Sequence, residues 1–206
     1  PGFRYSKNKN TIVANVYYQR SSLDGNISGG QKDDIRRTFN NVTYFGMLNY
    51  AFNRENTIRM FFRSGTDAPE ITQLQNIFDV SQPQYLSVGN KNLEPSFMHR
   101  INFHYVHSNL EKGRTFMWMF MFNKSKNSIA SSMYTGSSIT DDMIPELIGS
   151  NRPIQYSTYE NVKNGTMNIG TNLSFGLPLN FMKCNFNISG GVHYSQSPSL
   201  VNGQVN

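Results

Sequence analysis

Apolar and polar side chains alternate with a period of two along much of this chain. In Thr166–Leu177, TMNIGTNLSFGL, the odd positions are apolar or threonine and the even positions are Thr, Asn, Gly or Ser. Successive residues of a strand point to opposite faces, so the segment predicts a strand with one apolar and one polar face. The polar face is small, amide-rich and uncharged. This is typical of a wall between lipid and a hydrated lumen.

The same alternation predicts seven strands and an all-β fold. Tight turns make neighbouring strands antiparallel. We therefore expect an antiparallel up-and-down meander without parallel pairs. The expected strands are Thr11–Arg20, Asn41–Phe52, Thr57–Ser64, Ser96–Ser108, Arg114–Asn123, Thr166–Leu177 and Lys183–Ser195. One side of the sheet should carry Phe97, Ile101, Phe103, Phe116, Trp118, Phe120, Ile169, Leu173, Phe175, Phe186 and Ile188.

The expected connections alternate in length. Long loops are predicted at 25–40, 65–95 and 129–165. Tight turns are predicted at Lys7–Asn10, Asn53–Asn56, Glu111–Gly113 and Pro178–Asn180. Short turns at one end and long loops at the other are typical of outer-membrane barrels.

The loop at 65–95 has a helical signal. Asp67 can cap a helix and Glu70 follows three residues later, as in a capping box. Apolar residues then recur at helical spacing, at Ile71, Leu74, Ile77 and Phe78. One or two helical turns are expected, with irregular coil as the alternative because the run is short.

Composition agrees with a barrel wall. Charged residues make up 16% of the chain, aromatic residues 13%, and the mean hydropathy is −0.50. No apolar run approaches the ~18 residues of a membrane helix, whereas a barrel strand needs only about ten residues. The net charge is +6, but Lys and Arg are scattered and only Arg36 and Arg37 are adjacent, so no nucleic-acid partner is expected. The single cysteine, Cys184, cannot form an internal disulfide.

Two motifs lie within Thr57–Ser108. After a strand that ends in Arg63-Ser64, the chain reads APEITQLQ (68–75), and GNKNLEP (89–95) precedes the next strand. This stretch resembles the barrel of outer-membrane TonB-dependent receptors of the Bacteroidota type, in which the motifs read APxIxQLQ and GNxNLxPE. The order Glu94-Pro95 departs from the family's Pro-Glu. The resemblance does not indicate which substrate is bound.

The resemblance implies a nutrient importer in the cell outer membrane of a Gram-negative bacterium. Such a receptor has a barrel of about twenty-two strands and an N-terminal plug, and TonB supplies the energy. The resemblance therefore implies that the expected strands are a fragment of a large transmembrane β-barrel. The implied partners are outer-membrane lipid, the plug domain and the TonB system through the rest of the chain, and an unknown small-molecule or oligomeric nutrient.

Residues 1–206 are expected to form a single partial barrel domain. The chain opens in what reads as the tail of a strand, and Ser197–Asn206 does not read as a closing strand with a terminal aromatic residue. We therefore expect an internal piece of a longer barrel, whose isolated fragment would self-associate through its apolar side and open edges. The alternative class is a non-transporting surface binding or structural β module, an adhesin-like barrel or sandwich.

No pattern indicates an enzyme. The side chain of His104 points away from those of His99 and His107, so these three cannot converge on one metal. The acidic pairs at 33–34 and 141–142 read as solvated loop charge. No cofactor or metal site is expected.

The candidate substrate-binding residues come from the long loops, because Tyr and Arg combine contact area with hydrogen-bonding tips. They are Tyr85, Tyr134, Arg152, Tyr156 and Tyr159, and Phe78 is expected to pack inside its loop. The row Met117, Met119 and Met121 either faces the lumen, against a ligand or the plug, or lies in a strand buried on both faces.

Overall fold

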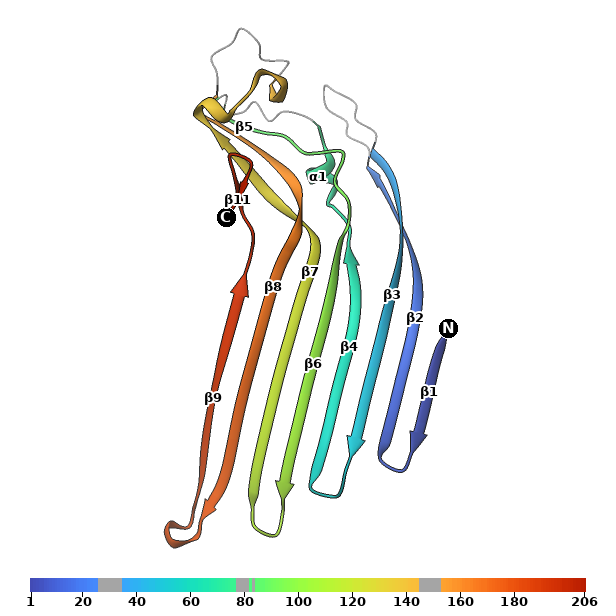
Figure 1. The fold of residues 1–206 in the computed structure, drawn as a ribbon, viewed down its shortest axis with the longest axis vertical. Coiled ribbons are helices and arrows are strands. Elements are labelled where there is room, and N and C mark those ends of the chain that lie inside the picture. Colours follow the sequence, from blue (N-terminus) through green and yellow to red (C-terminus); the bar gives the residue numbers. More distant parts are fainter. Residues whose placement is uncertain (26–34, 77–81, 83, 145–152) are drawn as a thin grey trace.

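A computed structural model describes residues 1–25, 35–76, 82, 84–144 and 153–206. Long neighbouring strands form one tall, curved wall (Figure 1). In order across the wall they are β1 (Gly2–Lys7), β2 (Asn10–Gly25), β3 (Ile35–Ala51), β4 (Asn56–Asp67), β6 (Ser96–Asn109), β7 (Arg114–Thr135), β8 (Gln155–Leu179) and β9 (Cys184–Gln196), each antiparallel to the next. The predicted all-β antiparallel meander is confirmed.

Strand register separates two faces of the wall. On one face Phe103 pairs with Phe120, which pairs with Thr171, and Trp118 pairs with Leu173. The register places all eleven residues predicted to share one side on this face, which we call the apolar face. The alternate positions form the polar face, which carries Asn102, Met121, Gly170 and other residues. On the apolar face Leu173 is 47% exposed and Val192 is 72% exposed. These side chains therefore form an extensive apolar surface within the described chain.

Tight turns join the strands at the lower end of the wall (Figure 1). In the β3–β4 turn, Asn53 Oδ1 accepts the backbone N–H groups of Glu55 and Asn56 at 2.9 and 2.8 Å. In the β6–β7 turn, Gly113 adopts φ +61°, a conformation that glycine reaches without steric cost. The last turn is Asn180–Met182, a 3-10 helix. It lies two residues later than predicted, because Pro178 and Leu179 still pair with β9.

The strands extend further upward than the sequence predicted. β7 has 22 residues and β8 has 25, so 129–135 and 155–165 are strand rather than loop. Residues 35–40 likewise belong to β3, and Gly65–Asp67 belong to β4. These segments lack clean apolar–polar alternation because they rise beyond the two-faced part of the wall, and cross-strand pairing keeps them extended.

A β-bulge divides β7 into a lower and an upper part. The register with β8 shifts between Lys124 and Lys126. Next to the shift, Ser125 Oγ lies 2.7 Å from Thr166 Oγ1 and accepts the Thr166 N–H at 3.0 Å. A Cβ on Gly165 would lie 2.1 Å from Ser128 Oγ, so the two strands approach closely here only because residue 165 is glycine. Above the bulge, β7 and β8 form a separate outer hairpin.

Short elements cover both edges of this outer hairpin. β5 (Tyr85–Ser87) pairs with β8, and β10 (Leu200–Val201), which forms a hairpin with β11 (Gln204–Val205), pairs with β7. Both pairings to the hairpin are parallel, so the prediction of no parallel pairs is wrong at this end. The segments approach from distant parts of the chain and are therefore not joined to their partners by tight turns.

The helical element in the 65–95 segment is one turn, α1 (Ile71–Leu74). It begins after Glu70 rather than Asp67, because the Gln73 side chain accepts the Glu70 N–H at 3.0 Å. Ile77 and Phe78 lie outside the described residues. Other short turns at this end are the 3-10 helices Gly136–Ser138 and Asp141–Met143. No helix in the described part of the chain is long and apolar enough to cross a membrane.

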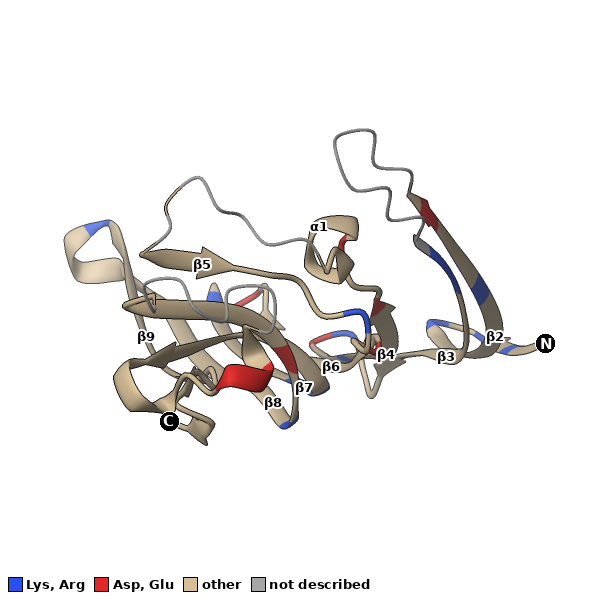
Figure 2. Cartoon of the chain, turned by 90° about the horizontal axis from the view of Figure 1, so that it is seen from above, with Lys and Arg blue, Asp and Glu red and all other residues tan. Residues whose placement is uncertain are grey.

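The buried core lies at the upper end, not in the wall. One cluster joins Leu86, Val88, Ile139, Ile144 and Tyr156. The second joins Leu74 and Leu93, both fully buried, with Leu23, Ile71, Ile129 and Tyr159 packed against them. Seen from above, α1 and β5 lie to one side of the curved row of strands (Figure 2). We call α1, β5, β10, β11 and the outer hairpin together the outer cap.

Candidate functional site

The outer cap contains a polar pocket of about 610 Å³. Its walls come from three parts of the chain: the segment before β6, the end of β7 with the turn after it, and the start of β8. We call it the outer pocket. It is lined by Asn76, Gly89, Asn90, Lys91, Asn92, Tyr134, Met143, Tyr156, Thr158 and Glu160.

Two tyrosines and a carboxylate form one side of the outer pocket. The rings of Tyr134 and Tyr156 lie with centroids 6.1 Å apart and planes inclined by 52°. The Tyr134 hydroxyl donates to Glu160 Oε1 at 2.8 Å. Burial raises the pKa of the Tyr156 phenol, the hydrogen bond with Thr158 acts in the opposite direction, and the charges of Tyr134 and Glu160 add to the rise. The Tyr156 phenol therefore stays neutral across the physiological pH range.

The two sequence motifs meet beside the outer pocket. The N–H groups of Gly89 and Asn90 donate to the carbonyl oxygens of Gln75 and Gln73 at 2.8 and 2.7 Å. A Cβ at residue 89 would lie 2.4 Å from the Gln75 carbonyl oxygen, so this approach requires glycine. Asn90 Nδ2 donates to the Tyr159 carbonyl oxygen at 2.8 Å. The motif residues thus tie the β4–β6 segment to β8.

A second pair of contacts fastens the end of the same segment. The Glu94 N–H donates to Asn161 Oδ1, and Asn161 Nδ2 donates to the Glu94 carbonyl oxygen, both at 2.8 Å. Leu93 is fully buried between these contacts. The GNKNLEP motif therefore has an architectural role in this structure.

The predicted binding residues fall into different environments. Tyr134 and Tyr156 come together in the outer pocket, although Tyr156 is only 8% exposed. Tyr159 packs against the second buried cluster and Tyr85 is half-exposed on β5, so neither lines the outer pocket. Arg152 lies outside the described residues. Binding by these residues stays a prediction.

Sequence reasoning missed several residues of the outer pocket. Thr158 and Glu160 lie in the segment predicted as a loop, whereas the structure places them in β8, where side chains two residues apart share one side with Tyr156. Asn90 and Asn92 were noted only as parts of a motif. Clustered amide side chains before a strand were the signal that could have identified them as pocket residues.

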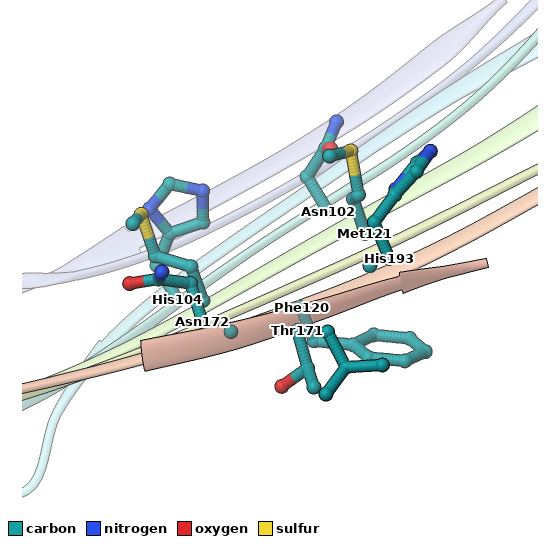
Figure 3. A pocket seen from close by; sticks show the side chains of 11 residues that line it. Asn102, His104, Phe120, Met121, Thr171, Asn172 and His193 are labelled. Carbon is teal, nitrogen blue, oxygen red and sulfur yellow. The ribbon is translucent and has the colours of Figure 1, made fainter. Parts of the chain in front are cut away.

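A second hollow of about 500 Å³ lies lower, at the β6–β9 side of the wall. Gly170 and Gly191 contribute no side chain there, and a Cβ on Gly170 would lie 3.1 Å from the terminal methyl carbon of Met121. Asn102, His104, Met121, Asn172 and His193 project from one side of the strands, whereas Phe120 and Thr171 project from the other (Figure 3). Met119 and Met121 thus lie on the polar face, and what covers this face in the whole protein stays a prediction.

The histidines of β6 lie on different faces of the wall. Register places His99 and His107 on the apolar face and His104 on the polar face, as the sequence predicted. Among the described residues, no group of three or more His, Cys, Asp or Glu side chains could hold a metal ion.

An antiparallel wall with one apolar and one polar face, tight turns at one end and folded segments at the other defines the class of outer-membrane β-barrels. Residues 31–206 match the model of the outer membrane protein beta-barrel family, and the chain belongs to this family. It is therefore a protein of the outer membrane. None of the curated proteins compared with the chain matches it.

Proposed function

We propose that the chain is part of a TonB-dependent receptor that imports a nutrient across the outer membrane and has no enzymatic activity. The support is the position of the segment with the two receptor-like motifs. Leu23 and Arg37 lie at polar-face positions of β2 and β3. Leu23 packs against the Leu74–Leu93 cluster, and Arg37 Nη1 donates to the Lys91 carbonyl oxygen. The motif segment therefore folds over the polar side of the wall.

This placement suits capture of a solute at the mouth of a barrel. In this proposal the apolar face contacts lipid, the polar face lines the lumen, and the outer pocket opens at the mouth. The outer pocket offers aromatic rings, amides and a carboxylate within one small space, so it combines contact area with hydrogen-bonding groups that can orient a polar ligand. The plug and TonB would act through the rest of the receptor.

Capture by TonB tests the proposal directly. The full-length protein in detergent should be retained on an immobilised periplasmic domain of TonB from the same organism, because energy transfer requires direct contact. An unrelated immobilised periplasmic domain serves as the control. Equal recovery of the protein on the TonB domain and on the control domain would contradict the import function and favour a non-transporting binding or structural module.

Surface labelling tests which end faces outward. Asn76 lines the outer pocket and Glu111 lies in a lower turn, and each is replaced by cysteine. In cells expressing the full receptor as a Cys184→Ser variant, a membrane-impermeant maleimide should label the first cysteine and not the second. Outer-membrane barrels carry their longer segments outside and their short turns in the periplasm. Labelling at residue 111 alone would show that the lower turns face outward and would contradict this orientation.

A further inference from the structure

The polar face of β4 and β6 carries an unusual concentration of positive charge. Arg63 stands directly opposite Arg100, and four residues lower Arg59 stands opposite His104. Like charges directly opposite one another in a sheet are unfavourable. We call Arg59, Arg63 and Arg100 the arginine band.

Nearby groups do not neutralise the arginine band. Arg100 Nε donates to Asn123 Oδ1 at 2.8 Å, and Arg59 Nε donates to Asn49 Oδ1 at 3.3 Å, so both bonds go to neutral amides. Arg63 is exposed and makes no hydrogen bond or ion pair with another described residue. On the polar face of β4 the first carboxylate is that of Asp67, at the outer end of the strand.

The same imbalance extends along the wall. From the lower turns up to the pair formed by Gly65 and Met98, the polar-face positions of the described wall strands hold no Asp or Glu. A surface with one sign of charge raises the local concentration of solutes with the opposite sign. His104 and Asn102, which adjoin the arginine band, also line the lower hollow.

From this arrangement we infer that the arginine band is a binding site for a small anion with carboxylate or phosphate groups, and that it selects anionic substrates for the receptor. The inference rests on the proposed import function. Guanidinium groups match carboxylate and phosphate oxygens in a two-bond fork, which suits both chemistries. The aromatic rings of Phe45, opposite Arg63, and Phe61, between the two charged rows, provide apolar contact for the rest of such a solute.

Calorimetric titration of the full-length receptor in detergent tests this inference. Pyrophosphate represents the phosphate class, citrate represents the carboxylate class, and sorbitol serves as the neutral probe. The receptor should bind one or both anions and not sorbitol, and added salt should weaken binding by screening. Each arginine lost should weaken binding about tenfold, the usual contribution of a hydrogen bond to a charged group.

The decisive comparison uses two double variants with the same change in net charge. Arg63→Gln with Arg100→Gln removes charge from the polar face. Lys124→Gln with Lys126→Gln removes it from the opposite face of the neighbouring strand. Only the first pair should lose anion binding, and Arg63→Lys should retain part of it. Unchanged thermal unfolding shows that both variants are folded.

Three outcomes would overturn the inference. They are absence of anion binding to the folded wild type, equal binding by all variants, and equal loss in both double variants, which would indicate a general charge effect. The arginine band would instead contact the plug if two results came together: the wild type binds no anion, and the upstream plug of an arginine variant becomes sensitive to protease. The titration contains no TonB, so its failure is distinguishable from failure of TonB capture.

Discussion

Replacing Leu173 with arginine should lower the free energy of unfolding of the full-length protein in lipid by about 2–4 kcal/mol. Leu173 lies on the apolar face near the middle of the lower part of β8, flanked by Trp118 and Gly190 in the neighbouring strands. A guanidinium at this depth must leave water or distort the bilayer. Urea titration of the protein folded into phospholipid vesicles measures the change.

The matched control is Asn172→Arg. Asn172 is adjacent in the same strand but on the polar face, between Met119 and Gly191. Its arginine would stay hydrated, so we expect a change of about 0.5 kcal/mol or less. If the two variants lost the same stability, the apolar face would not be the lipid-facing one.

Replacing Leu86 with alanine should loosen the outer cap while leaving the wall intact. Leu86 is 2% exposed at the centre of β5 and packs with Val88, Ile139 and Tyr156. Deletion of a buried leucine side chain costs about 2–5 kcal/mol, through lost burial and the cavity that remains. Because β5 pairs with β8 over only three residues, the loss should appear as local opening.

Amide hydrogen exchange of the full-length protein measures this opening. Exchange should accelerate at Val88, whose N–H donates to the Ser157 carbonyl oxygen at 3.0 Å, and remain slow in the lower part of β7. Leu110→Ala is the control, because Leu110 is 90% exposed in a lower turn. Uniform acceleration through the wall would show that cap and wall open as one unit.

The lower wall was predictable from the sequence for a simple physical reason. Each of its strands separates two different surroundings, so the side chains of Thr166–Leu177 must alternate, and the pattern reveals both the strand and its faces. The same argument correctly placed all eleven apolar-face residues, and it separated His104 from His99 and His107 on β6.

The outer cap was harder to predict because its structure depends on distant pairing. In 155–165 of β8, Tyr156 is buried, Glu160 faces a pocket and Lys163 is exposed, so polarity does not follow the period of two. β5 and β10 have three and two residues, too few for any periodic signal. Tyr134 and Tyr156 were selected for their chemistry, but their meeting with Glu160 follows from the register of β7 and β8, which the sequence did not reveal.

The way the motif segment is fastened sets an order of folding. Asn90 and the carbonyl group of Tyr159 are 69 residues apart, and the partner strand β8 comes later in the chain. The contacts of this segment with β8 therefore cannot form until β8 has joined the wall, whereas its contacts with Leu23 and Arg37 can form earlier. Contacts between residues so far apart form slowly, because a long loop must close first. The motif segment should thus complete its docking only as a late step, after the outer hairpin has emerged.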